Sequence, residues 1–172
     1  MYKERVLVLD TSAFIIGLDL FNLNLTLYTT PSIIEELKSF WVKVKCLTAL
    51  DLKKLKVLSP EKSFLDKVVE ASEKTGDRQK LSEADLSILA LALELKVKGE
   101  NPTIVTDDFS VQNVAQHLNM EYIPATHDKI KFYIEWVWYC PGCRNTFPSK
   151  KGLRFCPICG SQLKRKAVKI QR

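Results

Sequence analysis

The chain has 172 residues, of which 46% are hydrophobic and 27% charged, a composition typical of a folded protein and not of a disordered one. This length suits one ordinary domain with a small appended unit. No apolar run approaches the roughly 20 residues of a membrane-spanning helix, and the first residues lead into a short strand without a secretory signal. We therefore expect a cytoplasmic protein with no membrane partner.

The net charge of +6 is unevenly distributed along the chain. Residues 129–172 contain 11 lysines and arginines and one acidic residue, whereas residues 1–128 contain 15 basic and 19 acidic residues. A basic segment joined to an acidic one is typical of proteins that hold a polyanion with one part and process it with the other. The alternative is a solvated tail that only increases solubility.

The first predicted element is a buried strand at residues 6–9, where four branched apolar residues follow one another without alternation. Such a run is typical of a central parallel strand that is covered on both faces. The strand ends at Asp10, and the apolar residues 13–16 then predict a helix. Because ligands of open α/β sheets bind outside the carboxyl ends of the strands, Asp10 lies where such a fold performs its chemistry. The alternative role for Asp10 is a helix cap.

Further strands and helices alternate as far as residue 125. We predict strands at residues 25–28, 56–58, 103–106 and 121–124, and helices that start near Pro31 and cover residues 39–55, 60–75, 83–98 and 109–118. Strands that alternate with helices indicate βαβ units and an α/β sandwich around a parallel sheet. The core-facing residues expected on helices 39–55 and 83–98 are Phe40, Val44, Leu47 and Leu50, and Leu86, Leu89, Ala90, Leu93 and Val97.

The alternating pattern ends near Pro124, and a different unit follows. We place the main domain at residues 1–125, a linker at residues 126–138, and a small second domain with a basic tail at residues 139–172. Cys140, Cys143, Cys156 and Cys159 form two C-x2-C pairs separated by twelve residues in this second domain.

This cysteine spacing is typical of a zinc ribbon, in which four thiolates bind one structural Zn²⁺ tetrahedrally and leave no position open for a catalytic water. Two disulfides or a redox pair are the alternatives, and a cytoplasmic location disfavours disulfides. Cys46 stands alone on a predicted helix and is expected to be a buried apolar residue.

The predicted ribbon is rich in basic and aromatic residues. Cations bind phosphates and aromatic rings stack on unpaired bases, so this composition favours binding of RNA or DNA. Some of the aromatic residues have to form the small core of the ribbon, and we leave their roles open. We expect contacts to the nucleic acid from Lys150, Lys151, Arg154, Lys164, Arg165, Lys166 and Lys169.

Acidic residues recur on two of the predicted helices. On the helix that starts near Pro31, Glu36 lies on the flank of the apolar face and leans over the edge of the sheet, whereas Glu35 points to solvent. Asp85 lies at the start of helix 83–98. A capping box with Ser82 is its alternative role.

Two further acidic residues, Asp107 and Asp108, follow the strand at residues 103–106. Adjacent negative charges at the end of a buried strand repel each other unless a cation binds there. An all-oxygen cluster without nearby histidine or cysteine suits Mg²⁺ or Mn²⁺, ions that support hydrolysis of phosphodiesters.

These motifs together resemble a known family. V-L-D-T-S at Asp10, T-P-S-I-I-E-E-L at Glu36, L-S-E-A-D-L at Asp85 and I-V-T-D-D-F at Asp107 and Asp108 are similar, in order, to the motifs of PIN-domain ribonucleases. With the four-cysteine ribbon, nearly the whole chain resembles the archaeal Nob-type endonucleases. The segment D-D-F-S-V-Q-N-V-A at residues 107–115 is the most specific part of this resemblance.

The resemblance implies a PIN-like three-layer α/β sandwich with a parallel central sheet, followed by the zinc ribbon. It implies a divalent-metal-dependent, single-strand endoribonuclease that cleaves precursor small-subunit rRNA, in a pre-ribosomal particle, to form the mature 3′ end. Asp10, Glu36, Asp85 and one or both of Asp107 and Asp108 would then be catalytic residues that hold Mg²⁺ or Mn²⁺. The alternatives are a non-catalytic zinc-ribbon RNA-binding adaptor and a toxin-type PIN ribonuclease that acts on tRNA or mRNA.

Overall fold

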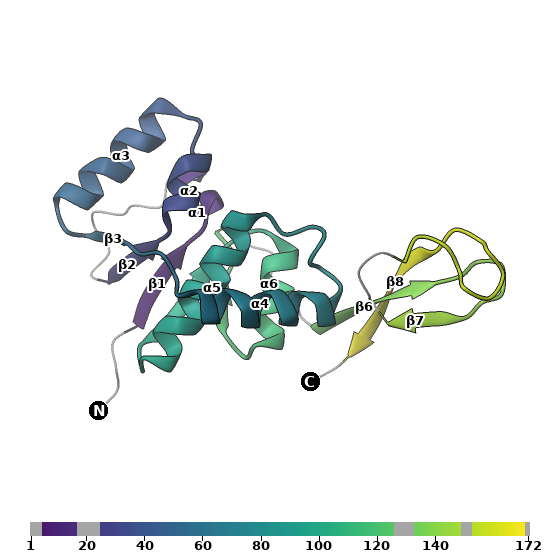
Figure 1. The fold of residues 1–172 in the computed structure, drawn as a ribbon. Helices are drawn as coiled ribbons and strands as arrows, with labels where there is room; N and C mark the ends of the chain where they lie inside the picture. The colour runs from purple at the N-terminus through teal and green to yellow at the C-terminus, as the bar shows by residue number, and fades with distance from the viewer. Residues whose placement is uncertain (1–4, 17–24, 126–132, 149–152, 171–172) are drawn as a thin grey trace.

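A computed structural model describes residues 5–16, 25–125, 133–148 and 153–170, without the side chains of residues 133–136 and 167–170. Figure 1 shows an α/β domain at the N-terminal side and a small sheet at the C-terminal side. Among the described helices, none is both long and apolar enough to span a bilayer.

The α/β domain is built on a sheet of five parallel strands in the order β3-β2-β1-β4-β5. These strands are β1 (Arg5–Leu9), β2 (Thr26–Thr29), β3 (Leu55–Val57), β4 (Asn101–Val105) and β5 (Glu121–Ile123). Strand β1 lies in the centre of the sheet, and its residues 6–9 are buried, as the sequence predicted. Because β1 and β4 are adjacent and parallel, the residues that follow them meet at one edge of the sheet.

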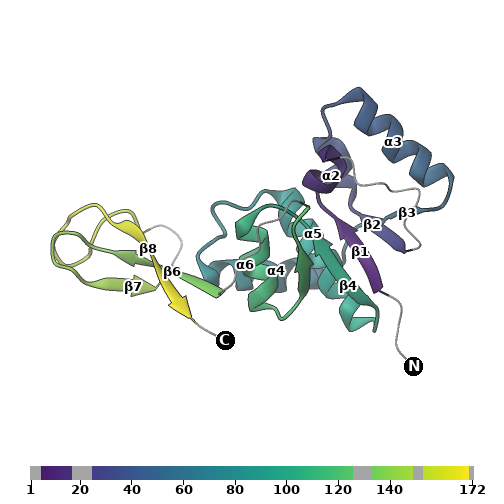
Figure 2. The same cartoon turned by 180° about the vertical axis from the view of Figure 1, so that it is seen from behind.

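Helices pack around this sheet (Figure 2). They are α1 (Thr11–Ile15), α2 (Pro31–Glu36), α3 (Phe40–Asp51), α4 (Lys62–Thr75), α5 (Glu83–Val97) and α6 (Phe109–His117). Helix α5 contacts β1, β4 and three other helices, and most of its circumference is apolar and buried. The prediction of a core position for Val97 is wrong, because this residue in the last turn is 65% exposed.

Helix α3 faces the sheet differently from the prediction. Phe40, Val44 and Leu47 were expected to face the core, but they are exposed. The residues that α3 buries are the smaller Cys46 and Ala49, which confirms the expectation for Cys46. Apolar side chains occur on both faces of α3, so helical periodicity alone does not indicate which face meets β3 at the sheet edge.

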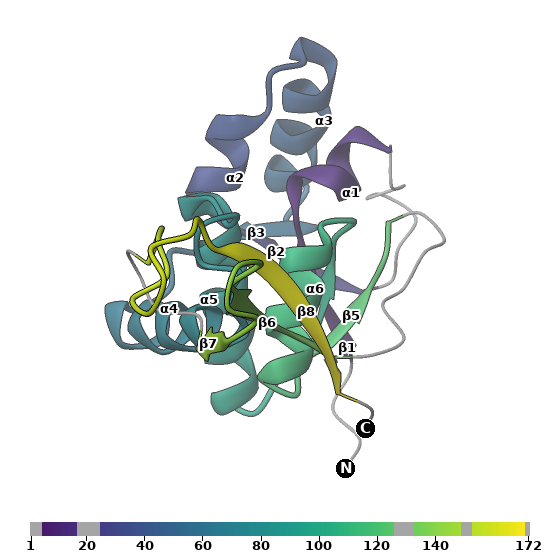
Figure 3. The same cartoon turned by 90° about the vertical axis from the view of Figure 1, so that its right-hand side faces the viewer.

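The C-terminal unit is an antiparallel sheet in the order β7-β6-β8. Its strands are β6 (Tyr133–Tyr139), β7 (Thr146–Pro148) and β8 (Lys164–Ile170). Strand β6 begins inside the segment 126–138 that the sequence predicted to be a linker, and it pairs with β8 along its whole length. Figure 3 views the molecule from the side of this sheet, where β6 contacts α4 and α6 of the α/β domain.

Candidate active site

The carboxylate of Asp10 lies at the carboxyl end of β1 and is only 6% exposed. Its Oδ1 accepts a hydrogen bond from the Thr11 backbone N–H at 2.6 Å, and this contact makes Asp10 the N-cap of α1. Its Oδ2 accepts hydrogen bonds from the hydroxyls of Thr106 at 2.7 Å and Ser12 at 3.2 Å. The helix cap therefore occupies one carboxylate oxygen, while the other faces the end of β4.

Two hydroxyl groups connect the ends of β1 and β4. The Thr106 hydroxyl donates to Asp10 and accepts a hydrogen bond from the Asp108 backbone N–H at 3.1 Å. The Ser12 hydroxyl likewise donates to Asp10 and accepts a hydrogen bond from the Asp107 backbone N–H at 3.2 Å. These bonds fix the acidic residues at the ends of β1 and β4 relative to one another. Thr106 and Ser12 were not singled out from the sequence, although each stands within two residues of an acidic motif position.

Asp108 and Asp107 have different surroundings at the end of β4. The Asp108 carboxylate caps α6 and accepts hydrogen bonds from the backbone N–H groups of Ser110 at 2.6 Å and Val111 at 3.3 Å. Asp108 is exposed, whereas Asp107 is half-buried.

Asp85 and Glu36 complete the group of acidic residues. Asp85 forms the capping box that the sequence suggested as its alternative role, because its Oδ2 accepts from the Ser82 N–H at 2.8 Å and its N–H donates to the Ser82 hydroxyl. Glu36, at the end of α2, accepts hydrogen bonds from the Thr11 hydroxyl at 3.2 Å and the Ser82 hydroxyl at 3.5 Å. Glu36 thus links Thr11, the residue after Asp10, to Ser82, which forms the capping box with Asp85.

We refer to Asp10, Glu36, Asp85 and Asp108 together as the carboxylate edge. Burial raises the pKa of the Asp10 carboxyl, and the charge of Asp108 adds to this effect, so the hydrogen bonds from Thr106, Thr11 and Ser12 offset it only in part. Burial also raises the pKa of Asp85 despite its bonds to Ser82, and the charges of Asp10 and Asp108 contribute. Carboxylates that hinder one another's ionisation are suited to a cation, which favours their charged forms.

The carboxylate edge is not a compact cluster of ligand atoms. Among the described residues, only four cysteines bring three or more metal-ligating atoms within 4.8 Å of one another. Mg²⁺ keeps several of its waters and binds through one or two carboxylates directly, so widely spaced oxygen ligands are compatible with it.

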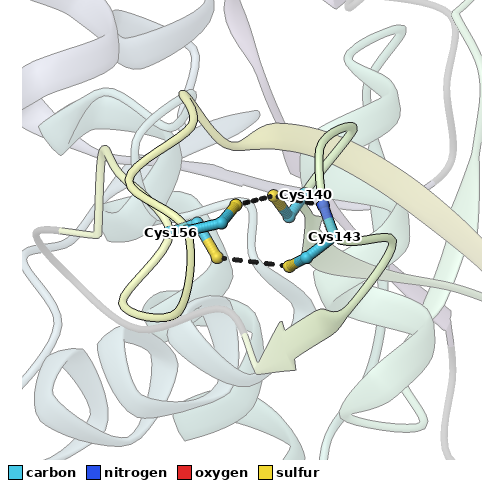
Figure 4. A group of neighbouring side chains, drawn as sticks. Cys140, Cys143 and Cys156 are labelled. Carbon is cyan, nitrogen blue, oxygen red and sulfur yellow. Dashed lines mark hydrogen bonds between the residues drawn. The ribbon is translucent and has the colours of Figure 1, made fainter.

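The four cysteines lie on two loops of the C-terminal sheet, and we call them the cysteine cluster. Figure 4 shows the sulfurs of Cys140, Cys143 and Cys156 pointing toward one another between these loops. The Sγ atoms of Cys140 and Cys159 are 3.3 Å apart, and those of Cys143 and Cys156 are 3.5 Å apart. Sulfurs at 2.3 Å from a tetrahedral zinc ion lie about 3.8 Å from one another. The cluster therefore fits zinc.

The two cysteine loops pack closely against each other. A Cβ atom at Gly142 would lie 2.5 Å from the Ser161 Oγ and 3.3 Å from the Cys159 Sγ, so only glycine fits there without a shift. Each loop turns back after its second cysteine through a residue with positive φ, Arg144 at 62° and Gly160 at 73°. In both loops the N–H of that residue donates to the carbonyl of the first cysteine at 2.9 Å.

The sulfurs of the cluster differ in proton affinity. Hydrogen bonding with Ser161 lowers the pKa of Cys159 to about 6. The Cys143 N–H favours the Cys140 thiolate, but burial and the neighbouring sulfurs outweigh this effect and raise the pKa of Cys140 to about 11. Because zinc binds thiolates, its binding would release the protons that the cluster holds.

The predicted RNA-binding residues have different surroundings. Arg165 donates hydrogen bonds to the Gly76 carbonyl and, at 3.3 Å, to the Asp77 carboxylate, which is 1% exposed and also accepts from Asn113 at 2.7 Å. Arg165 thus connects the C-terminal sheet to the loop between α4 and α5. Its neighbours Lys164 and Lys166 are exposed.

The remaining predicted RNA contacts are described in part. Arg154 is exposed and lines a cavity of about 490 Å³ together with Gln79 of the α/β domain. Lys150 and Lys151 lie outside the described residues, and the side chain of Lys169 is not described either.

Comparisons with known proteins agree with this architecture. The family model described as the PIN domain of ribonuclease matches residues 7–95. The chain is 41% identical over 165 residues to endoribonuclease Nob1 of Methanocaldococcus jannaschii, a match that covers 96% of this chain and 79% of that protein. It is 39% identical over 164 residues to endoribonuclease Nob1 of Pyrococcus abyssi, with 95% of each chain covered.

A third relative carries a different name. Ribonuclease VapC1 of Thermoplasma acidophilum is 39% identical over 163 residues, a match that covers 93% of this chain and 77% of that protein. All three relatives are named as ribonucleases, and the two Nob1 proteins match nearly the whole of this chain. The chain therefore belongs to the PIN-domain ribonucleases and, within them, to the Nob1 endoribonuclease family.

Proposed function

We propose that this endoribonuclease cleaves single-stranded precursor small-subunit rRNA, with Mg²⁺ or Mn²⁺ at the carboxylate edge, to form the mature 3′ end. The observation that carries the proposal is the convergence of Asp10, Asp85 and Asp108 at the carboxyl end of the sheet, where their charges oppose one another. The Nob1 family resemblance supplies the choice of substrate.

Within this proposal Asp10, Glu36, Asp85 and Asp108 hold the divalent ion. When bound, the ion would supply a Lewis acid that activates water and stabilises negative charge on the attacked phosphate. Asp108 is the better candidate of the two adjacent aspartates, because its charge acts on both Asp10 and Asp85. Asp107 would then assist from the side of Ser12.

The chain's own hydroxyl groups prepare the carboxylate edge for an ion. The bonds from Thr106 and Ser12 fix the Oδ2 of Asp10, and the capping box fixes Asp85 at the start of α5. Side chains that are already held lose little freedom when the ion and the RNA bind, which is the main advantage of a preorganised site.

The ribbon would bind the RNA outside the cleavage point. Zinc has a structural role here, since four cysteines leave no open coordination position. Phosphate contacts would come from lysines and arginines of the ribbon, and these contacts would make affinity dependent on salt. The residues proposed for this role are Lys150, Lys151, Arg154, Lys164, Lys166 and Lys169.

A toxin-type ribonuclease that cleaves tRNA or mRNA is a second candidate, because one of the closely related proteins is named VapC1. The two candidates differ in substrate and share the metal chemistry. A mechanism without catalysis, as in an adaptor protein, does not explain why desolvated carboxylates are grouped at the end of the sheet.

The test is cleavage of a short RNA that spans the 3′ end of precursor small-subunit rRNA, with Mn²⁺, with Mg²⁺ and with EDTA. Asp10→Asn should abolish cleavage and retain RNA binding. Asp66→Asn is the matched control, because Asp66 is exposed on α4, and it should cleave normally. Cleavage of tRNA in preference to this RNA would support the toxin-type candidate. Equal cleavage by Asp10→Asn would remove the carboxylate edge from the mechanism.

A further inference from the structure

An exposed aromatic pair lies at the start of α3. Phe40 and Trp41 are 70% and 72% exposed, and their rings meet edge to face with centroids 5.5 Å apart. Neither ring is needed for the packing of α3, which contacts the domain through Cys46 and Ala49. Large aromatic side chains that remain in solvent are costly to keep and indicate a binding surface.

A cavity lies between the first turn of α3 and the carboxylate edge, and its lining includes Ser39 and Val42, which flank the aromatic pair in the sequence. It has a volume of about 460 Å³, and Thr11, Glu36 and Val42 of α3 line it. Thr11 and Glu36 are the residues that hydrogen-bond to each other beside Asp10. The other walls include the apolar side chains of Ile15 and Leu37. A flat apolar group placed in this cavity would lie directly beside the carboxylate edge.

The same segment carries the positive charge of the α/β domain. Residues 37–58 contain six lysines and one acidic residue, whereas the rest of residues 1–128 contains nine basic and 18 acidic residues. Lys38 lines the cavity, and Lys43 and Lys45 are exposed on α3. An anionic ligand is therefore attracted to this part of an otherwise acidic domain.

Helix α3 and the ribbon lie on opposite sides of the carboxylate edge. Figures 1 and 2 show them at opposite ends of the molecule. Helix α3 contacts α1, which Asp10 caps, while the ribbon contacts α6, which Asp108 caps. The carboxylate edge thus lies between two basic surfaces. A strand that passes over it can be held on both sides.

We propose that Phe40 and Trp41, here called the α3 platform, stack on unpaired bases of the RNA and hold the strand on the side of the cleavage point opposite the ribbon. This inference rests on the proposed ribonuclease function. Aromatic rings stack on every base, and lysines bind the backbone, so the α3 platform would favour single strands over any particular sequence. A paired base has no free face to offer, which would explain specificity for single strands.

RNA is favoured here over a protein partner for two reasons. Exposed Lys38, Lys43 and Lys45 stand next to the aromatic pair in the sequence, whereas lysine is depleted at the centres of protein interfaces. The adjoining cavity also shares Thr11 and Glu36 with the carboxylate edge, so a protein seated there would compete with the substrate.

The test measures equilibrium binding of a short, unstructured, fluorescein-labelled RNA in the Asp10→Asn background, where binding can be followed without cleavage. Trp41→Ala should weaken binding by about tenfold or more, the loss expected for one stacked base. Trp41→Phe should restore most of the affinity. Val97→Ala is the matched control, because Val97 is as exposed but lies at the far end of α5, and it should bind normally.

An RNA with abasic sites separates stacking from charge, because it retains every phosphate. Abasic RNA should bind the parent protein as weakly as intact RNA binds Trp41→Ala, and it should cause little further loss in that variant. Full affinity of Trp41→Ala for intact RNA would overturn the proposal. The proposal would also be overturned if the parent protein were a dimer and Trp41→Ala a monomer, since the α3 platform would then be an interface between two copies. These binding results are independent of whether the wild-type protein cleaves the RNA.

Discussion

The carboxylate edge and the cysteine cluster are both candidate metal sites, and they are built in opposite ways. The cysteine cluster takes its ligands from two short loops and places all four sulfurs within 4.8 Å of one another. The carboxylate edge takes its ligands from the ends of β1 and α2 and the starts of α5 and α6, which are distant in the sequence. One site is closed and local, and the other is open and assembled by the fold.

This difference fits the two roles that we propose. A closed set of sulfurs holds zinc permanently and stabilises a sheet that is too small to have a large core. An open set of oxygens leaves room for water and substrate around an exchangeable ion. Hydroxyl groups hydrogen-bond to Asp10 and fix its carboxylate at the carboxylate edge. We therefore expect the cysteine cluster to depend on its metal for folding and the carboxylate edge to be formed without one.

The largest effect should follow loss of zinc. Cys143→Ser removes one of the four ligands, and structural zinc contributes on the order of 10 kcal/mol to the folding of small metal-binding domains. We expect the ribbon to unfold and the zinc content to fall far below one ion per chain, while the α/β domain stays folded. Zinc analysis by mass spectrometry and two-dimensional NMR of the ribbon amides would measure both.

Cys46→Ala is the matched control for this experiment. Cys46 is buried in the α/β domain, so its replacement should lower the stability of that domain by creating a cavity. Zinc content should remain at one ion per chain. A folded ribbon in metal-free Cys143→Ser would contradict a structural role for zinc.

The contact between the two regions should show the next largest effect. Arg165→Ala leaves the buried Asp77 without its cation, which should cost about 2 kcal/mol of unfolding free energy and loosen the ribbon from α4. Lys164→Ala should have little effect on stability, because Lys164 is exposed. Lys164→Ala should instead weaken RNA binding and lower the number of counterions released on binding, read from the slope of log affinity against log salt, by somewhat less than one.

Urea unfolding, together with RNA binding at several salt concentrations, would distinguish the roles of Arg165 and Lys164. If Arg165→Ala reduced the salt dependence as strongly as Lys164→Ala and left stability unchanged, Arg165 would be an RNA contact, as the sequence analysis predicted.

The two sites also differ in how much of them the sequence predicts. The cysteine spacing predicts the geometry of the cysteine cluster, since two C-x2-C pairs bind one ion tetrahedrally whatever the rest of the fold is. Asp10 and Asp108 are also predictable, because buried strands end there and parallel strands meet at one edge. The contact between Arg165 and Asp77 has no such signal. It depends on how two folded units meet, and the sequence shows only a basic strand and a polar loop.

The hydroxyl groups and α3 show a second limit of sequence analysis. Thr106 and Ser12 look like ordinary residues after a strand. Only the register of β1 and β4 brings the Thr106 hydroxyl to Asp10 and the Asp107 N–H to Ser12. The exposed face of α3 was predicted to be buried because Phe40, Val44 and Leu47 form an apolar stripe at helical spacing. Apolar residues are buried on average, but a folded protein still exposes many of them, so the stripe alone does not identify the buried face.

Thr106→Val tests whether hydroxyl groups prepare the carboxylate edge. Valine has the shape of threonine but removes the bond to Asp10 and leaves the Asp108 N–H without that acceptor. An unsatisfied buried group costs about 1 to 3 kcal/mol. If that cost appears in the transition state, the single-turnover rate of RNA cleavage should fall by about ten- to a hundredfold.

Thr103→Val provides the control, because Thr103 is buried on the same strand and its hydroxyl accepts from Arg5 at 2.7 Å, away from the carboxylate edge. It should lose stability and keep its cleavage rate. Equal rates for Thr106→Val and the wild type would mean that the bound ion, and not the hydroxyl, positions Asp10.

The smallest effect should be a gain of stability at the carboxylate edge. Asparagine at position 108 keeps the cap of α6, since Asn caps helices as well as Asp, and removes a charge that opposes ionisation of Asp10 and Asp85. Because Asp108 is exposed, solvent screening limits the gain of Asp108→Asn to about 0.5 kcal/mol, measured by urea unfolding of the zinc-loaded protein without added Mg²⁺ or Mn²⁺.

The pH dependence of this gain identifies its cause. Asp10 and Asp85 have pKa values raised above their ordinary range, so folding favours their protonated forms and their charges destabilise the protein as pH rises through those values. The gain from Asp108→Asn should therefore be full at neutral pH and disappear in acid, where Asp10 and Asp85 are neutral in both proteins. A gain that persists unchanged in acid would come from the cap of α6 and not from relief of repulsion among the carboxylates of the carboxylate edge.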